Sequence, residues 1–186
     1  MTYLEKIKLK DGKTCILRNC TAKDGETVLE VFQLTHAQTD LLLTYPEESG
    51  FTVEQEAQFL QDRTDSPDEI EILAEIDGKV VGTGGIGCIG RKEKLKHRAE
   101  FGVSVDKGYW GLGIGRALTR ACIKCAKDAG YSQLELDVVA ENDRAISMYK
   151  NEGFIEFGRN PRGFRTRENR WQELVLMRLE LDKLCF

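Results

Sequence analysis

The stretch that decides the fold is Tyr109–Arg116, which reads Tyr-Trp-Gly-Leu-Gly-Ile-Gly-Arg. It lies between an apolar run, Phe101–Val105, and a helical pattern that begins near Ile114. Glycines bring no side chain for packing, but they permit positive φ and let a ligand approach the backbone closely. The first turn of a helix adds unpaired N–H groups and the positive end of its dipole. This order of strand, glycine loop and helix predicts an anion site, most naturally for a phosphate or pyrophosphate.

Two common phosphate-binding motifs do not fit this loop. A P-loop ends in Lys-Ser or Lys-Thr, whereas Arg and Ala follow Gly115. The dinucleotide fingerprint requires Gly or Ala at its sixth position, which is Arg116 counted from Gly111 and Leu118 counted from Gly113. Carboxylates do follow in the next predicted strand, so spacing alone leaves a nicotinamide-dependent enzyme as an alternative.

A second motif lies downstream of the loop. Its residues have the spacing Asn, two residues, Ala, three residues, Tyr, then Gly-Phe; they are Asn142, Ala145, Tyr149, Gly153 and Phe154. Together with the glycine loop, this motif resembles the GNAT N-acetyltransferase superfamily, which binds acetyl-coenzyme A. The family's phosphate loop reads Gln or Arg, two residues, Gly, one residue, Gly or Ala. Gly113 and Gly115 fit that pattern, while Trp110 stands at the Gln/Arg position. The resemblance covers roughly residues 70–180.

The resemblance implies a set of residues that hold the coenzyme. N–H groups of the loop and the first helical turn would face the pyrophosphate, and a strand backbone would pair with the pantetheine arm. The residues implied are Val103, Val105, Leu112, Gly113, Ile114, Gly115, Arg116, Ala117 and Asn142. Read without the resemblance, Val103 and Val105 are core strand residues and Asn142 is an N-cap.

Two residues are candidates for catalysis. Tyr149 would protonate the departing thiolate, because an unperturbed phenol with a pKa of about 10 stays protonated at neutral pH. The alternative is a tyrosine that packs the helix on its apolar face. Glu100, at the start of the strand before the loop, would act as the base, through water. The alternative there is an exposed carboxylate at a strand end.

The sequence thus predicts an N-acetyltransferase that transfers acetyl from acetyl-CoA to a primary amine by direct attack in a ternary complex. The acceptor is left open between a small molecule and a protein or peptide amine. A non-catalytic acyl-CoA-binding module or sensor of the same fold is the alternative. Dimers are common among relatives, so a homodimer is one expectation.

Composition is that of an ordinary soluble domain. The 186 residues fit one domain, 1–186, and carry a net charge of −4, which argues against nucleic acid as the main partner. No apolar run approaches the ~20 residues needed to span a bilayer, and the N-terminus has no apolar signal-peptide core. We therefore expect a cytoplasmic protein without a membrane partner. Two basic runs, 91–98 and 159–170, are interpreted as solvated loops; a minority interpretation places one near the 3′-phosphate or an acidic acceptor.

Six cysteines are present, at 15, 20, 88, 122, 125 and 185. The pair Cys122 and Cys125 falls on an apolar helical phase well inside the predicted helix, and no second close pair of Cys or His accompanies it. We interpret these thiols as buried core residues and expect no metal site.

The remaining pattern predicts a single α/β domain with a central mixed, largely antiparallel twisted sheet and helices on both faces. Strands are expected at 14–20, 98–105 and 133–139, with a final antiparallel pair at 154–158 and 173–181. Asp77-Gly78 between apolar runs predicts a type I′ hairpin. Helices are expected over 21–35, from Thr52, over 114–130 and over 142–152.

Overall fold

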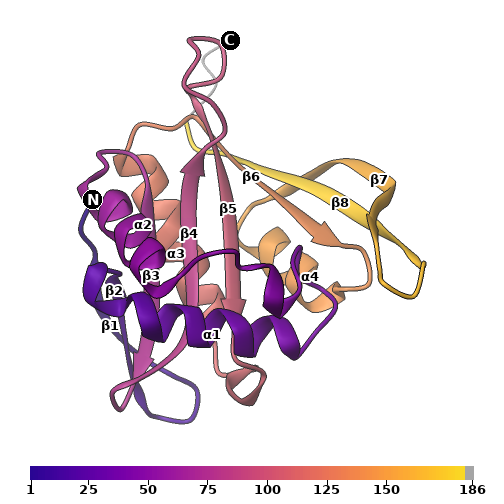
Figure 1. The fold of residues 1–186 in the computed structure, drawn as a ribbon. Helices are drawn as coiled ribbons and strands as arrows, with labels where there is room; N and C mark the ends of the chain where they lie inside the picture. The colour runs from indigo at the N-terminus through magenta and orange to yellow at the C-terminus, as the bar shows by residue number, and fades with distance from the viewer. Residues whose placement is uncertain (183–186) are drawn as a thin grey trace.

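The computed structural model describes residues 1–182, which form one eight-stranded sheet in the order β1-β2-β3-β4-β5-β6-β8-β7. Every neighbouring pair is antiparallel except β5 and β6. The elements are β1 (Leu4–Lys8), β2 (Thr14–Asn19), α1 (Gly25–Ala37), α2 (Val53–Asp65), β3 (Ile70–Ile76), β4 (Lys79–Cys88), β5 (Arg98–Val105), α3 (Ile114–Asp128), β6 (Gln133–Val139), α4 (Asp143–Asn151), β7 (Ile155–Arg165) and β8 (Trp171–Glu180). The predicted mixed, largely antiparallel sheet is confirmed (Figure 1).

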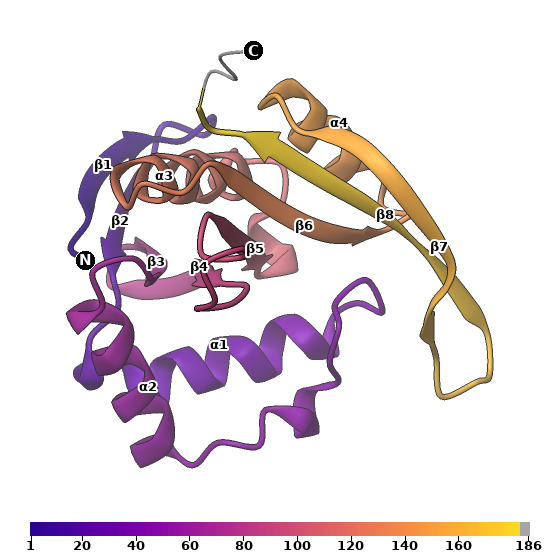
Figure 2. The ribbon, with the colours of Figure 1, turned by 90° about the horizontal axis from the view of Figure 1, so that it is seen from above.

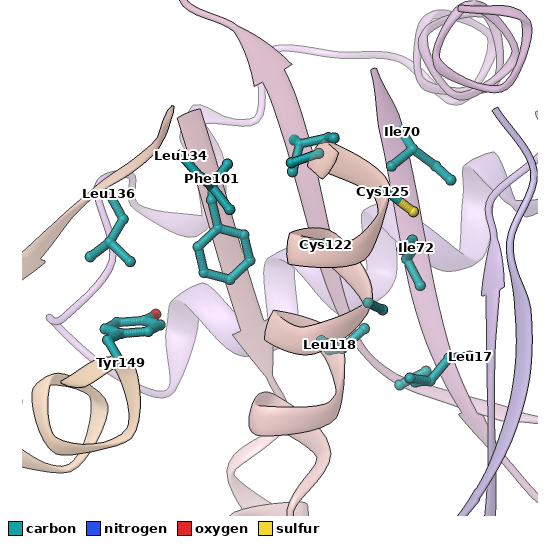
Figure 3. Packing of buried hydrophobic residues seen from close by; sticks show 14 of the residues in the cluster. Leu17, Ile70, Ile72, Phe101, Leu118, Cys122, Cys125, Leu134, Leu136 and Tyr149 are labelled. Atoms are coloured by element: carbon teal, nitrogen blue, oxygen red, sulfur yellow. The ribbon is translucent and has the colours of Figure 1, made fainter. Parts of the chain in front are cut away.

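Helices cover both faces of the sheet. Figure 2 shows α3 and α4 on one side and α1 and α2 on the other. The face toward α3 carries the larger apolar cluster, in which Leu118 and Cys122 of α3 pack over Ile70 and Ile72 of β3 (Figure 3). The face toward α1 and α2 carries a smaller cluster centred on Leu60 and Leu73. Burial of apolar side chains on both faces holds the three layers together.

Local signals place the element boundaries as the sequence predicts. Asp77 and Gly78 have φ values of 51° and 80°, as a type I′ turn requires at both central positions. Thr52 accepts a hydrogen bond from the Gln55 N–H, and the Gln55 side chain accepts one from the Thr52 N–H, which makes the expected capping box. Gly130, at φ 83°, follows the end of α3.

Three features differ from the prediction. β1 carries no strong strand pattern, and pairing with β2 forms it. α1 begins at Gly25, after a 3₁₀ turn over Ala22–Asp24, so the helix starts later than expected. β7 continues to Arg165 through part of the basic run that we interpreted as a loop. Its arginines lie exposed along the edge strand of the sheet, where charged side chains are tolerated.

The cysteines are core residues, as the helical phase predicts. Cys15, Cys20, Cys122 and Cys125 are buried free thiols and Cys88 is half-buried, whereas Cys185 lies outside the described residues. Burial raises the pKa of the Cys125 thiol to about 11, which keeps it protonated and unreactive. Among the helices of residues 1–182, none is long and apolar enough to cross a membrane.

Candidate functional site

The site begins where β5 and β6 separate. Their parallel ladder pairs only Arg98, Ala99 and Glu100 with residues 133–135. β5 continues to Val105 and β6 to Val139, but the two strands no longer pair beyond Glu100 (Figure 1). A gap therefore opens in the middle of the sheet.

The backbone of Val103 and Val105 faces this gap. The N–H of Asp106, just after β5, donates to the Val81 carbonyl oxygen over 2.9 Å, so the hydrogen-bonded pairs with β4 continue at residues 104 and 102 of β5. Such pairs alternate with non-hydrogen-bonded ones along an antiparallel ladder. The N–H and C=O groups of Val103 and Val105 therefore point away from β4, into the opening toward β6. The Val105 carbonyl is taken by a side chain of the loop, so an extended ligand bearing amides could pair, as a strand would, with the Val103 N–H and C=O and the Val105 N–H.

The glycine loop closes one end of the gap. Gly111 and Gly113 have φ values of 90° and 101°, in the region that favours glycine. Gly113 is the N-cap of α3, and the first helical hydrogen bond runs from the Ala117 N–H to the Gly113 carbonyl. The N–H groups of the preceding residues of that turn have no partner within the helix. These N–H groups form the N–H cradle of this site, and their binding of an anion stays a prediction.

Trp110 takes a position that the motif gives to Gln or Arg. Its indole Nε1–H donates to the Val105 carbonyl oxygen over 2.7 Å. Two cations approach its ring, with Lys107 Nζ and Arg144 Cζ at 5.8 and 5.7 Å from the centroid. The tryptophan thus ties the loop to the end of β5 and supports basic side chains beside the cradle.

A cavity of about 490 Å³ occupies the gap. Of the predicted coenzyme-binding residues, seven line it: Val103, Val105, Gly113, Ile114, Gly115, Arg116 and Asn142. Leu112 and Ala117 do not line it. The cavity touches Met148 of α4 on one face of the sheet and Thr35 of α1 on the other, so it passes through the sheet at the gap.

Sequence reasoning missed several cavity residues. Lys10 and Arg144 add positive charge beside the cradle, and Thr39, Leu41 and Leu42, after α1, form a wall. Arg144 could have been found from the sequence, because it lies in the first turn of the helix that Asn142 caps. Lys10 could not, because only the fold brings its turn to the loop, where its N–H donates to the Leu112 carbonyl over 3.3 Å.

Asn142 caps α4, as predicted from the sequence. Its Oδ1 accepts a hydrogen bond from the Ala145 N–H over 3.2 Å. The residue also lines the cavity. One side chain is therefore placed both to start the helix and to border the ligand space.

Tyr149 lies in an aromatic cluster behind the cavity wall. Its ring is edge-on to Phe101 of β5, 6.0 Å between centroids, and 5.7 Å from that of Phe154. Figure 3 shows the side chain directed from α4 toward β5. Burial raises the pKa of the phenol above its ordinary value, so the hydroxyl stays protonated across the physiological range and is a weaker acid than an exposed phenol. Tyr149 is not among the cavity-lining residues, and its acid role stays a prediction.

Glu100 is the last residue of the β5–β6 ladder, opposite Glu135 in β6 and Gly87 in β4. Its neighbours Ala99 and Phe101 belong to the cluster under α3, so its side chain points to the other face, toward α1 and α2. It is exposed, and it does not line the cavity. A carboxylate here stands at the edge of the gap, where a proton could reach it through water; its role as a base stays a prediction.

A model of the acetyltransferase (GNAT) family matches residues 35–154, which include the glycine loop, the gap and the Asn142–Phe154 motif. The chain belongs to the GNAT family. The resemblance drawn from two motifs is therefore confirmed, and the separated β5 and β6 belong to a GNAT fold.

Relatives extend this family assignment. L-amino acid N-acetyltransferase AaaT of Escherichia coli (strain K12) is 30% identical over 144 residues, 75% of this chain and 82% of the relative. L-amino acid N-acyltransferase MnaT of the same organism is 27% identical over 112 residues, 60% of this chain and 64% of the relative, so the match falls short of two thirds of its length. The structure of yncA from Salmonella typhimurium with its cofactor acetyl-CoA has a TM-score of 0.80 at 19% identity, covering 91% and 95% of the two chains, and shows the same fold.

The two segments of this GNAT chain that carry no motif meet in space. Arg167, in the turn between β7 and β8, pairs with Glu47, and its guanidinium lies 3.7 Å from the Tyr45 ring centroid. Gln172 donates to the Asp40 carbonyl over 3.0 Å. The segment after α1, which holds Asp40, Tyr45 and Glu47, thus contacts the basic run that we interpreted as a solvated loop, beside the cavity wall. Neither basic run supplies a cavity-lining residue.

The cavity fits coenzyme A in its chemistry. It offers a free strand edge to amides, an N–H cradle to a diphosphate, and Lys10, Arg116 and Arg144 as positive charges. Arg116 also pairs with Glu152 at 3.0 Å, which holds it at the rim. Within residues 1–182, no group of three or more His, Cys, Asp or Glu is arranged to hold a metal ion.

Proposed function

We propose that this GNAT protein is an acetyl-CoA-dependent N-acetyltransferase that acts on a primary amine in a ternary complex. The observation that supports it most is the cavity through the sheet, which joins the N–H cradle, the free edge of β5 and the opposite face in one space. Such a space lets a coenzyme bind on the α3 and α4 side while an amine approaches from the α1 side.

The chain's residues divide the work of holding the coenzyme. The first turn of α3 would bind the diphosphate, where each hydrogen bond to a charged group is worth about 1.5–3 kcal/mol. Val103 and Val105 would orient the pantetheine arm through main-chain bonds. A free N–H on this edge would stabilise negative charge developing on the carbonyl oxygen. Acetyl-CoA supplies the acetyl group as a thioester.

Two side chains would move protons. Glu100 would accept one proton from the amine nitrogen through water, and the C–N bond would form as the C–S bond breaks. The Tyr149 hydroxyl would donate a proton to the departing sulfur and would be reprotonated by the second proton of the nitrogen. An amine with a lysine-like pKa of about 10.4 arrives protonated and needs such a base. The high pKa of Tyr149 fits a donor that remains protonated until the thiolate forms.

The acceptor proposed for first trial is the α-amine of an amino acid or peptide. This choice rests on the activity for which AaaT is named, since the chain shares 30% identity with it over 82% of that relative's length. Free L-amino acids, peptides with free N-termini and diamines form the panel.

Release of free thiol from acetyl-CoA across this panel tests the proposal, with acetyl-CoA binding measured in parallel by calorimetry. We expect binding together with amine-dependent thiol release. Tight binding with no release for any amine would favour the non-catalytic acyl-CoA-binding alternative. Thermal stabilisation by NAD(H) and none by acetyl-CoA would contradict both and favour a nicotinamide enzyme.

A further inference from the structure

The sheet face under α1 and α2 has a floor without side chains next to the gap. Glu71 of β3 pairs with Gly85 of β4, and Gly85 pairs with Gly102 of β5, so the three residues lie in one row across the strands. Directly opposed residues of antiparallel strands project to the same face. A Cβ at Gly102 would meet no atom within 4 Å, so the space above it is open.

The Glu71 carboxylate reaches over this floor. A Cβ at Gly85 would collide with Oε2 of Glu71, so the carboxylate occupies the place where a side chain of β4 would otherwise stand. It therefore crosses β4 toward the open space at Gly102. Any larger residue at position 85 would remove this placement.

Glu71 has no cation of its own among residues 1–182. Arg63 of α2 lies over Gly87, the next residue of β4 on this face, where it donates to the Ile86 carbonyl over 2.6 Å and pairs with Glu69 at 3.4 Å rather than with Glu71. Glu56 of α2 is only 8% exposed and adds a second carboxyl nearby. Burial raises the pKa of Glu71 to about 7 and Glu56 adds to the rise, while Arg63 and Thr83 oppose it. A half-buried carboxyl in this setting gains from an incoming cation.

The floor adjoins the proposed reaction space. Glu100 and Ser104 flank Gly102 on the same face of β5, and same-face neighbours on a strand lie about 7 Å apart. The Ser104 hydroxyl receives a hydrogen bond from the Thr35 hydroxyl of α1 over 3.4 Å, and both residues line the cavity through the sheet. A small group above Gly102 would therefore lie next to Ser104, at the edge of the cavity, and between Glu71 and Glu100.

We propose that Gly85 and Gly102 form the floor of the amine-binding site and that Glu71 holds the ammonium group of the acceptor, opposite Glu100. The inference rests on the proposed acetyl transfer and adds a binding residue that no motif marks. Glu71 pairs with the ammonium ion as it binds; when Glu100 takes one proton from it through water, the neutral amine leaves this pair and attacks the acetyl carbonyl carbon. A proton and an ammonium ion compete for the same carboxylate, so amine affinity rises as pH increases through the pKa of Glu71.

Steady-state kinetics of Glu71→Gln separates binding from chemistry, with Glu75→Gln as the matched control. Glu75 lies on the same strand and face but pairs with Arg18 at 3.6 Å, away from the floor. For the best amine of the panel, Glu71→Gln should raise KM by about 10- to 100-fold, the range for a lost charged hydrogen bond. It should leave kcat within about threefold and the KM for acetyl-CoA unchanged. The fall in amine KM between pH 6 and pH 8 should disappear.

Gly102→Ala tests the floor without touching a charged group. Because an added Cβ meets nothing, the variant should fold normally and bind acetyl-CoA like the parent protein, yet its amine KM should rise. Normal amine KM values in both Glu71→Gln and Gly102→Ala would overturn the inference while acetyl transfer still stood.

A titration independent of turnover distinguishes failure of the inference from failure of the proposed function. Side-chain carboxyl ¹³C NMR of the full chain, with coenzyme A present, follows Glu71 as methylammonium is added. We expect the Glu71 signal to shift and its apparent pKa to fall, whereas the Glu75 signal should not respond to methylammonium. A Glu71 signal that ignores methylammonium would refute the amine site even if transfer is seen. A shift of the Glu71 signal without thiol release would support the amine site and contradict the proposed acetyl transfer.

Discussion

The two faces of the sheet differ in the kinds of side chain that they carry. Toward α3, β3 presents Ile70 and Ile72, which are fully buried with Leu118 against them. Toward α1 and α2, the same strand presents Glu71 and Glu75 on either side of a single apolar residue of the smaller cluster, Leu73. The face toward α3 is filled by packed apolar side chains. The face toward α1 and α2 carries carboxylates and glycines with open space above them, and its apolar cluster is smaller. The proposed chemistry uses the boundary between them, at the gap between β5 and β6.

The largest effect should come from the proton donor on the packed face. Tyr149→Phe removes only the hydroxyl, so kcat should fall by about 10²- to 10⁴-fold, the usual contribution of a positioned acid, while acetyl-CoA affinity is kept. Rapid-quench turnover and calorimetry would measure the two quantities. Tyr131→Phe is the control, because Tyr131 is also buried but lies beside Cys88 and Asp68 where β6 begins. Equal turnover in both variants would show that Tyr149 only packs.

Loss of core packing should have the next largest effect. Leu118→Ala removes a fully buried side chain between α3 and the sheet. Leu118 lies over Gly84 of β4, with its Cβ 3.4 Å from the place that a Cβ at Gly84 would take. We expect a loss of about 2–5 kcal/mol in the free energy of unfolding, measured by urea denaturation. Leu4→Ala, at a residue 72% exposed, should change it by less than about 0.5 kcal/mol. Similar losses at both sites would contradict the assignment of the core.

The carboxylate Glu71 on the face toward α1 and α2 should make the free energy of unfolding depend on pH. Glu71 has a pKa raised from 4.5 to about 7, so the folded protein binds more protons than the unfolded chain between these values. Its contribution to stability is full below pH 4.5 and is lost as pH rises through 7. Relative to Glu71→Gln, the parent protein should therefore lose about 1–3 kcal/mol between pH 5 and pH 8. Parallel stability curves for the two proteins over this range would refute it.

The smallest effect compares two glycines near the gap. Gly113 has φ 101°, so Gly113→Ala should cost about 1–2 kcal/mol of stability and weaken acetyl-CoA binding at the cradle. Gly102 has no positive φ and open space around it, so Gly102→Ala should leave stability unchanged or raised by about 0.4–1 kcal/mol. Chemical denaturation and calorimetry would separate them; equal costs at both positions would argue against strain at Gly113.

The part of the site that would bind the coenzyme through main-chain N–H groups was predictable from the sequence. Glycines at 111, 113 and 115 before a helix, and Asn142 at the next helix start, carry their meaning in local spacing. Glu71 carries none, because its placement depends on the register that sets Gly85 and Gly102 beside it. The contact of Arg167 with Glu47 likewise joins residues 120 positions apart, whose pairing only the fold decides. β7 was predicted too short because its arginines resemble loop residues, although an edge strand accepts them.

The hydrogen bond from the Trp110 indole to the Val105 carbonyl gives the molecule a built-in optical reporter. The chain holds two tryptophans, and Trp110 borders the cavity whereas Trp171 sits on β8 near Arg162 and Arg165. A ligand arm that engages the end of β5 would disturb the environment of the first chromophore and leave the second as an internal reference. Intrinsic emission, without any attached dye, could then follow occupancy of the cleft in real time.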